Sequence, residues 1–281
     1  MARSTGNHFA TNSTELNWDV KPTEIYHGDK QIINGNYALI RSDNQKVLEI
    51  HKDSYNPFYN VEFKALLDDL QKISGFENLT YSEFKEGRIV LGYLENNSTN
   101  ECKVNGFDVN KYLVLGNSHD GSKGIFLGTS EVMIRCTNAF GQILKSNVIK
   151  HTKNNFRRID ELKQAFEVYH KQNEILAKLY VKMNNISIDQ SLIDMVTKRM
   201  FDVDNNEEKQ LSTRKDNQII DFHASIKTET NDLGNNVFGL FHGMTHYTSH
   251  KLKGENVVGN LFGTASKMNE KGFQAIKELV F

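Results

Sequence analysis

The chain has 281 residues, of which 34 are Lys or Arg, 35 are Asp or Glu, and 38% are hydrophobic. This composition suits one large or two small globular domains, and it excludes collagen-like, disulfide-scaffold and wholly disordered proteins. Because the formal net charge is -1, any attraction to nucleic acid has to come from a local patch.

The cysteines and the N-terminal segment predict where the protein is found. Cys102 and Cys136 have no CxxC spacing, which favours a reducing cytoplasm over an oxidising compartment. Residues 1–8 lack the apolar region of a secretory signal, and no stretch approaches the about 18 uncharged apolar residues of a membrane span. We expect a cytoplasmic protein with no membrane partner, no cofactor and no metal, located in the host cytoplasm if a virus encodes it.

The front of the chain predicts an α+β domain. Residues 1–17 are polar and without periodicity, so we expect a flexible arm there, followed by the domain over residues 18–153. Pairs of short apolar runs that flank turn residues predict a mostly antiparallel sheet built of β-hairpins. A helix from Asn60, its expected N-cap, to Ser74 packs on one face of this sheet. The three hairpins span residues 37–50, 79–93 and 111–134.

The pattern becomes helical after Asn138, and residues 154–281 predict a helical region packed on the front domain or following it. Residues 202–209 are strongly charged and predict a linker between two of the helices. The amphipathic segments are residues 156–180, 188–201, 218–228, 236–251 and 271–280.

Residues 116–123, with the sequence Gly-Asn-Ser-His-Asp-Gly-Ser-Lys, lack the Gly-Lys-Ser order and the following helix of a phosphate-binding loop. Asp120-Gly121 between two apolar runs predicts a hairpin turn instead. His119 and Asp120 could act as a general base and its orienter, but neighbouring side chains on a strand point to opposite faces, which favours the turn. In the catalytic alternative, Asn117, Arg135, Cys136 or Asn138 would complete a polar cleft.

Three histidines are spaced four residues apart, at His242, His246 and His250. Two of them could chelate zinc from one helix face, but a metalloprotease helix carries Glu where Gly243 stands. We therefore predict a polar helix face here.

The clearest charge feature is a run of cations that no acidic residue interrupts between Gly141 and Ile159. Such a run could follow a nucleic-acid backbone, with Phe140 and Phe156 stacking on bases, or it could be a solvated loop. The predicted phosphate-binding residues are Lys145, Lys150, Lys153, Arg157 and Arg158, with Arg88 and Arg135 as secondary candidates.

A series of motifs resembles the phage/plasmid-like family, a domain of unknown function found in bacteriophages, plasmids and prophages. The most specific pieces are Asn-Ser-His-Asp-Gly-Ser at 117–122 and Arg-Cys-Thr-Asn at 135–138. Phe238 and Ser249 stand where the family usually has Trp and Asp. The other matching pieces are residues 16–20, 41–43, 55–60, 87–88, 112–116, 151–152, 236–240, 245–247, 250 and 262–263.

The resemblance implies a mobile-element protein and supplies no activity, so three hypotheses follow. The first is single-stranded DNA or RNA binding or annealing in replication or recombination, because hairpins, a packed helix and a cationic strip are similar to the layout of single-strand annealing proteins. The second is an enzyme with a polar cleft around His119, Asp120, Arg135 and Asn138, and the third is a structural or packaged virion protein. A homo-oligomer is compatible with all three.

Overall fold

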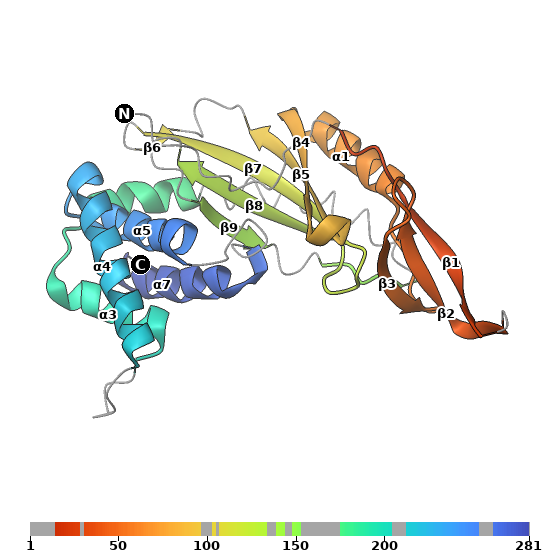
Figure 1. The fold of residues 1–281 in the computed structure, drawn as a ribbon. Coiled ribbons are helices and arrows are strands. Elements are labelled where there is room, and N and C mark those ends of the chain that lie inside the picture. The colour runs from red at the N-terminus through yellow and green to blue at the C-terminus, as the bar shows by residue number, and fades with distance from the viewer. Residues whose placement is uncertain are drawn as a thin grey trace.

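The computed structural model describes residues 15–28, 31–96, 103–104, 107–133, 139–143, 148–152, 175–203, 212–252 and 261–280. Two antiparallel sheets occupy the first half of the chain, and a helical bundle forms the second (Figure 1). The predicted α+β class is therefore confirmed. Of the predicted arm, residues 1–14 lie outside the described residues, whereas Leu16 is buried in the core.

A three-stranded sheet opens the fold and projects from the end of the molecule opposite the C-terminal helices (Figure 1). The predicted hairpin at 37–50 is confirmed by the pairing of β2 with β3. The outer strand β1 was not predicted, because its residues are mostly exposed and Pro22 is rarely found inside strands. The strands are β1 (Val20–His27), β2 (Gln31–Arg41) and β3 (Val47–Lys52).

A larger sheet follows, with strand order β4-β5-β7-β8-β9 and a short β6 paired with β7. The second and third predicted hairpins are confirmed by the β4–β5 and β7–β8 pairings. β9 lies just after Asn138, where no strand was predicted, because pairing with β8 decides the conformation of this five-residue segment. The elements are β4 (Glu77–Phe84), η1 (Lys85–Gly87), β5 (Ile89–Asn96), β6 (Lys103–Val104), β7 (Phe107–Ser118), β8 (Phe126–Met133) and β9 (Ala139–Ile143).

The helix α1 (Asn60–Ser74) packs on one face of the larger sheet and buries Phe63, Leu66, Leu67 and Leu70. Contrary to prediction, its N-cap is Tyr59 and not Asn60. The free amides of its first turn are bound from a distance by Asp19, whose carboxylate accepts hydrogen bonds from Asn60 N (2.8 Å) and Val61 N (3.3 Å). Asp19 thus ties the start of the three-stranded sheet to α1.

The opposite face of the larger sheet is covered as well, so the expectation of a single covered face was incomplete. Nearly every side chain of β5 is buried. Phe262 meets Phe126 of β8 edge-on, with ring centroids 4.5 Å apart. The central strands therefore form a core layer between two coverings.

The helical half has its own hydrophobic core. The predicted helices at 188–201, 218–228, 236–251 and 271–280 are confirmed with shifted ends. Of the predicted 156–180 segment, residues 175–180 belong to a helix that continues to residue 184, and the rest lies outside the described chain. No helix among the described residues is long and apolar enough to cross a membrane. The named helices are α3 (Gln190–Phe201), α4 (Thr213–Leu233), α5 (Val237–His246), the π-helical turn η3 (Tyr247–Lys251) and α7 (Thr264–Val280).

The predicted polar face of three histidines is wrong for His242. This residue is buried against Phe238 and Phe241, at ring-centroid distances of 4.4 and 5.2 Å, and burial lowers its pKa to about 3. The reason is that α5 is apolar on all sides and therefore occupies the centre of the helical core. His246 is mostly buried near Glu229, while His250 is exposed.

We predict that Asp19→Ala lowers the free energy of unfolding by about 1–2 kcal/mol, because it removes the carboxylate that binds the first amides of α1. Urea denaturation followed by circular dichroism measures the change. Asp68→Ala, at an exposed position of the same helix, is the control and should change stability by less than about 0.5 kcal/mol. Equal losses for the two variants would contradict the capping role.

Candidate functional site

Most of the described motif pieces that carry the family resemblance meet at one place, where the three-stranded sheet, the start of α1 and the β7–β8 turn come together. Their side chains are buried or half-buried and are mostly polar or aromatic. No function was assigned to most of them from the sequence, although the motif pieces contain all of them except His51. This sheet junction consists of Trp18, Arg41, His51, Tyr55, Asn60, Asn117, His119 and His151.

The centre of the sheet junction is a hydrogen bond between His119 and Asn60, 2.9 Å long and fully buried. The amide nitrogen of Asn60 donates to the backbone oxygen of Trp18 (3.1 Å), an atom that can only accept. The amide oxygen of Asn60 must therefore accept from His119, which places the imidazole proton on Nε2. Through its two hydrogen bonds, the Asn60 amide joins the start of α1 to the residue after β7 and to the segment before β1.

Beside this bond, Arg41 lies over the ring of Trp18, with its guanidinium carbon 3.8 Å from the ring centroid. The guanidinium also donates two hydrogen bonds to Asp43 (2.9 and 2.8 Å) and one to Glu83 (2.6 Å). Trp18 Nε1 donates to the second oxygen of Glu83 (2.5 Å). One carboxylate from β4 thus holds both members of the cation–π pair.

On the other side of His119 lies a stack of rings. His51 and Tyr55 are parallel, with centroids 3.7 Å apart, and the ring of His151 is 4.9 Å from Tyr55. His51 Nε2 donates to the backbone oxygen of His119 (2.7 Å), and the Tyr55 hydroxyl donates to the backbone oxygen of Ser118 (3.1 Å). The end of β7 is therefore held by β3 and by the segment that leads into α1.

The turn after β7 has the predicted hairpin chemistry. Gly121 has φ +66°, and the Asp120 carboxylate accepts a hydrogen bond from Ser122 N (2.9 Å). Asn117, just before the turn, donates from its amide to the backbone oxygen of Phe58 (2.8 Å). The turn is consequently fixed to the body at its base while its tip stays exposed.

Two imidazoles of the junction, those of His119 and His151, are neutral at physiological pH. Burial lowers the pKa of His119 to about 3 and that of His151 to about 4, since charge is costly to place away from water. Within the described part of the chain, no group of three or more His, Cys, Asp or Glu side chains could hold a metal ion. These two imidazoles therefore contribute packing and orientation, and no positive charge.

The predicted catalytic pairing of His119 with Asp120 is not formed. The His119 ring bonds inward to Asn60, whereas the Asp120 carboxylate bonds to the backbone of its own turn. Asn117 is likewise directed inward, to the Phe58 backbone. The remaining predicted members of the cleft lie outside the described residues: Arg135, Cys136 and Asn138.

The structure does bring Arg88 and Lys150 to the same end of the larger sheet. Arg88 precedes β5, and its backbone oxygen accepts from His119 N (2.7 Å). Ile125 and Ile149 form an antiparallel bridge, which brings Lys150 beside the same turn. The backbones of two cations 62 positions apart in the sequence thus lie at the same end of the larger sheet.

Two further lysines join them, one in the β4–β5 turn and one in the β7–β8 turn. Within the described residues, none of the four forms an ion pair with a carboxylate. Lys123 lies over the ring of Phe262, with its nitrogen 4.7 Å from the centroid. Asp120 lies in the same turns and forms no ion pair with another described residue. This turn strip comprises Lys85, Arg88, Lys123 and Lys150.

Other acids near the turn strip are already bound by neighbouring cations. Glu83 is held by Arg41, and Glu86 forms an ion pair with Lys46. The pKa of Glu86 is lowered chiefly by its hydrogen bond to Lys46, and nearby Arg88 adds to the effect. The other predicted phosphate-binding residues lie outside the described residues: Lys145, Lys153, Arg157, Arg158, and the secondary candidate Arg135.

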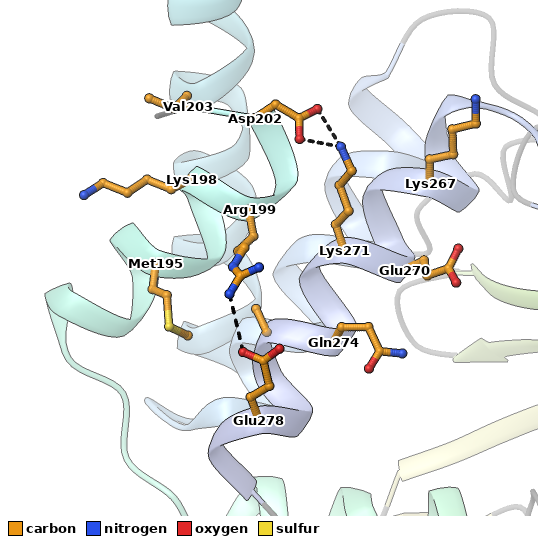
Figure 2. Close-up of a pocket in the computed structure, with 11 residues that line it drawn as sticks. Met195, Lys198, Arg199, Asp202, Val203, Lys267, Glu270, Lys271, Gln274 and Glu278 are labelled. Carbon is orange, nitrogen blue, oxygen red and sulfur yellow. Dashed lines mark hydrogen bonds and ion pairs between the residues drawn. The ribbon is translucent and has the colours of Figure 1, made fainter. Parts of the chain in front are cut away.

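A separate hollow of about 810 Å³ lies between α3 and α7 (Figure 2). Ion pairs span it, since Lys271 binds Asp202 (2.5 Å) and Arg199 reaches Glu278 (3.6 Å). Its lining mixes four cations with three carboxylates, so the field in it is weak. The hollow joins two helices and offers little attraction for a polyanion.

The chain matches the family described as Domain of unknown function (DUF932) over residues 47–275. Because the match covers most of the chain, the protein belongs to this family. No curated protein and no solved structure matches the chain. The matched region contains the turn strip and every junction residue except Trp18 and Arg41.

We predict that Gly87→Ala destabilises the protein by about 3 kcal/mol, because a Cβ would lie 2.3 Å from Arg41 Nη1 and 2.8 Å from the Trp18 ring. Gly35→Ala is the matched control: its φ is also positive, but no atom lies within 4 Å of the new Cβ. We expect it to cost about 1 kcal/mol in urea denaturation. A loss no larger for Gly87→Ala than for Gly35→Ala would show that the contact with Arg41 and Trp18 is unimportant.

The buried histidines also predict an acid-sensitive fold. Above pH 6.5 they are neutral in both states, whereas below it the unfolded chain binds protons that the folded chain cannot. The free energy of unfolding should therefore fall between about pH 6.5 and 4, by up to about 1.4 kcal/mol per pH unit for each histidine. Urea denaturation of His119→Gln over this range should give a slope smaller by one such contribution, and an unchanged slope would contradict the assignment.

Proposed function

We propose that the protein binds single-stranded DNA or RNA along the turn strip, as an accessory factor in nucleic-acid replication or recombination. The observation that carries the proposal is that Arg88 and Lys150, predicted separately as phosphate ligands, lie at one end of the same sheet with two further lysines, and that none of the four forms an ion pair with a carboxylate among the described residues. Clustered cations on a nearly neutral protein attract a phosphate backbone locally.

The sheet junction supports this proposal through rigidity. A strip that is already ordered loses little conformational entropy when it binds, so its cations need not be gathered at the moment of contact. His119 and His151 are neutral and add no charge, so the positive charge of the strip is that of its lysines and arginine. Phe262, half-buried beneath Lys123, supplies an aromatic ring at the same place.

The proposed setting is a mobile element, either a bacteriophage, a plasmid or a prophage, with the protein acting in the host cytoplasm. Annealing requires two strands to be held at once, which a homo-oligomer would provide by presenting several turn strips. Lys150 would then link the turn strip to the other predicted phosphate-binding residues of the cationic run: Lys145, Lys153, Arg157 and Arg158.

We predict that Arg88→Glu combined with Lys150→Glu weakens binding of a fluorescent single-stranded oligonucleotide at least tenfold at low salt, because two phosphate contacts become repulsive. The slope of log K against log salt should become shallower by about 1.4. Fluorescence anisotropy across a salt series measures both. Replacing six predicted phosphate-binding residues with Glu should abolish binding: Arg88, Lys145, Lys150, Lys153, Arg157 and Arg158.

The control carries the same change of net charge elsewhere, as Lys72→Glu with Lys178→Glu, two exposed positions on α1 and on the helix at 175–184. This control should bind as the wild type does. No salt-sensitive binding by the wild type, or equal weakening in the control, would overturn the proposal.

A further inference from the structure

The three-stranded sheet has one face on the core and one face toward solvent. Leu39 of β2 is fully buried on the inner face, so its neighbours Ala38 and Ile40 point outward. Strand pairing places two rows of residues side by side on that outer face, Lys21–Ile40–Val47 and Thr23–Ala38–Ile50. Val47 is 49% exposed and Ile50 is 56% exposed.

Lysines flank this apolar patch. Lys21 ends one row, and Lys52, paired with Asn36, follows Ile50 on the same face. Both are exposed, and neither forms an ion pair with a carboxylate within the described chain. The outer sheet face, defined as Lys21, Ala38, Ile40, Val47, Ile50 and Lys52, is therefore apolar at its centre and positive at its margins.

Helix α4 lies at the other end of the molecule (Figure 1). It has an exposed stripe that is apolar at its centre, like the outer sheet face, but carries acidic residues beside that centre. Its apolar centre is Ile220, which is 63% exposed, with exposed Ala224 one turn further on. Asp216 and Asp221 are exposed beside Ile220. The α4 stripe is defined as Asp216, Asn217, Ile220, Asp221 and Ala224, with Arg214 and Lys227 beyond its two ends.

From this complementarity we propose that the occupant of the outer sheet face is a second copy of this chain, docked through its α4 stripe. A sheet buries an exposed apolar face by packing a helix on it, which is the arrangement found between layers of a domain. Ile220 would lie on Val47 and Ile50, and Asp216 and Asp221 would face Lys21 and Lys52. Two copies of the outer sheet face would instead bring lysines together.

This contact is heterologous, because each copy would use a different surface for each of its two neighbours. The three-stranded sheet and α4 lie at opposite ends of the molecule (Figure 1), so the α4 stripe of one copy cannot pack on the outer sheet face of the same copy. The assembly is therefore a closed ring or an open filament, and not a two-fold dimer. The inference stands on surfaces remote from the turn strip and does not depend on nucleic-acid binding.

The test uses two charge-reversed full-length proteins. In the first, Lys21→Glu and Lys52→Glu make the outer sheet face acidic; in the second, Asp216→Lys and Asp221→Lys make the α4 stripe basic. Sedimentation velocity should show the wild type as an oligomer at low salt and each variant alone as a monomer. An equimolar mixture should regain the oligomer, because every contact in an alternating assembly again joins opposite charges.

A second pair of variants tests the apolar centre. Ile50→Asp should abolish the oligomer, while Ile73→Asp, a comparably exposed position on α1, should leave it unchanged. Circular dichroism confirms that each variant is folded. A monomeric wild type at every concentration up to the solubility limit, an oligomer that survives in either charge variant alone, or a mixture that stays monomeric would overturn the proposal.

Discussion

The buried hydrogen bond from His119 Nε2 to the amide oxygen of Asn60 is the constraint on which the rest of the structure depends. It joins residues 59 positions apart, and through the other end of the Asn60 amide it reaches the backbone of Trp18. A buried polar group left without its partner costs about 1–3 kcal/mol. The bond therefore specifies how the two sheets and α1 meet more sharply than apolar packing alone.

The residues around this hydrogen bond support the fold, and they are distinct from the residues proposed to contact a ligand. Side chains of the sheet junction are directed inward to backbone oxygens and to each other, and the imidazoles of His119 and His151 carry no charge at neutral pH. The groups able to meet a polyanion lie outside, on the turns that the junction holds in place. This division explains why side chains of the most specific motif, around His119, form hydrogen bonds within the fold, while the proposed binding residues around it are ordinary surface cations.

Much of the fold could be predicted from local patterns. Asp120-Gly121 between apolar runs and the helical spacing after Asn60 depend on neighbouring residues alone. Strand β9 and the burial of His242 could not be predicted, because each is decided by segments distant in sequence. The junction was present in the sequence as separate motifs, but the contact between His119 and Asn60 follows only from the tertiary fold. The joining of Arg88 with Lys150 has the same origin, since it needs the pairing of β5 with β7 and the bridge between Ile125 and Ile149.

The protonation of His119 tests this account most directly, because the hydrogen-bond pattern of Asn60 allows one tautomer. Long-range proton–nitrogen NMR correlation of the imidazole at pH 7 distinguishes the two ring nitrogens. We predict a neutral ring with the proton on Nε2 and a bare Nδ1, unchanged when the pH is lowered to 5. A proton on Nδ1, or a doubly protonated ring at pH 5, would contradict the central place given to the bond between His119 and Asn60.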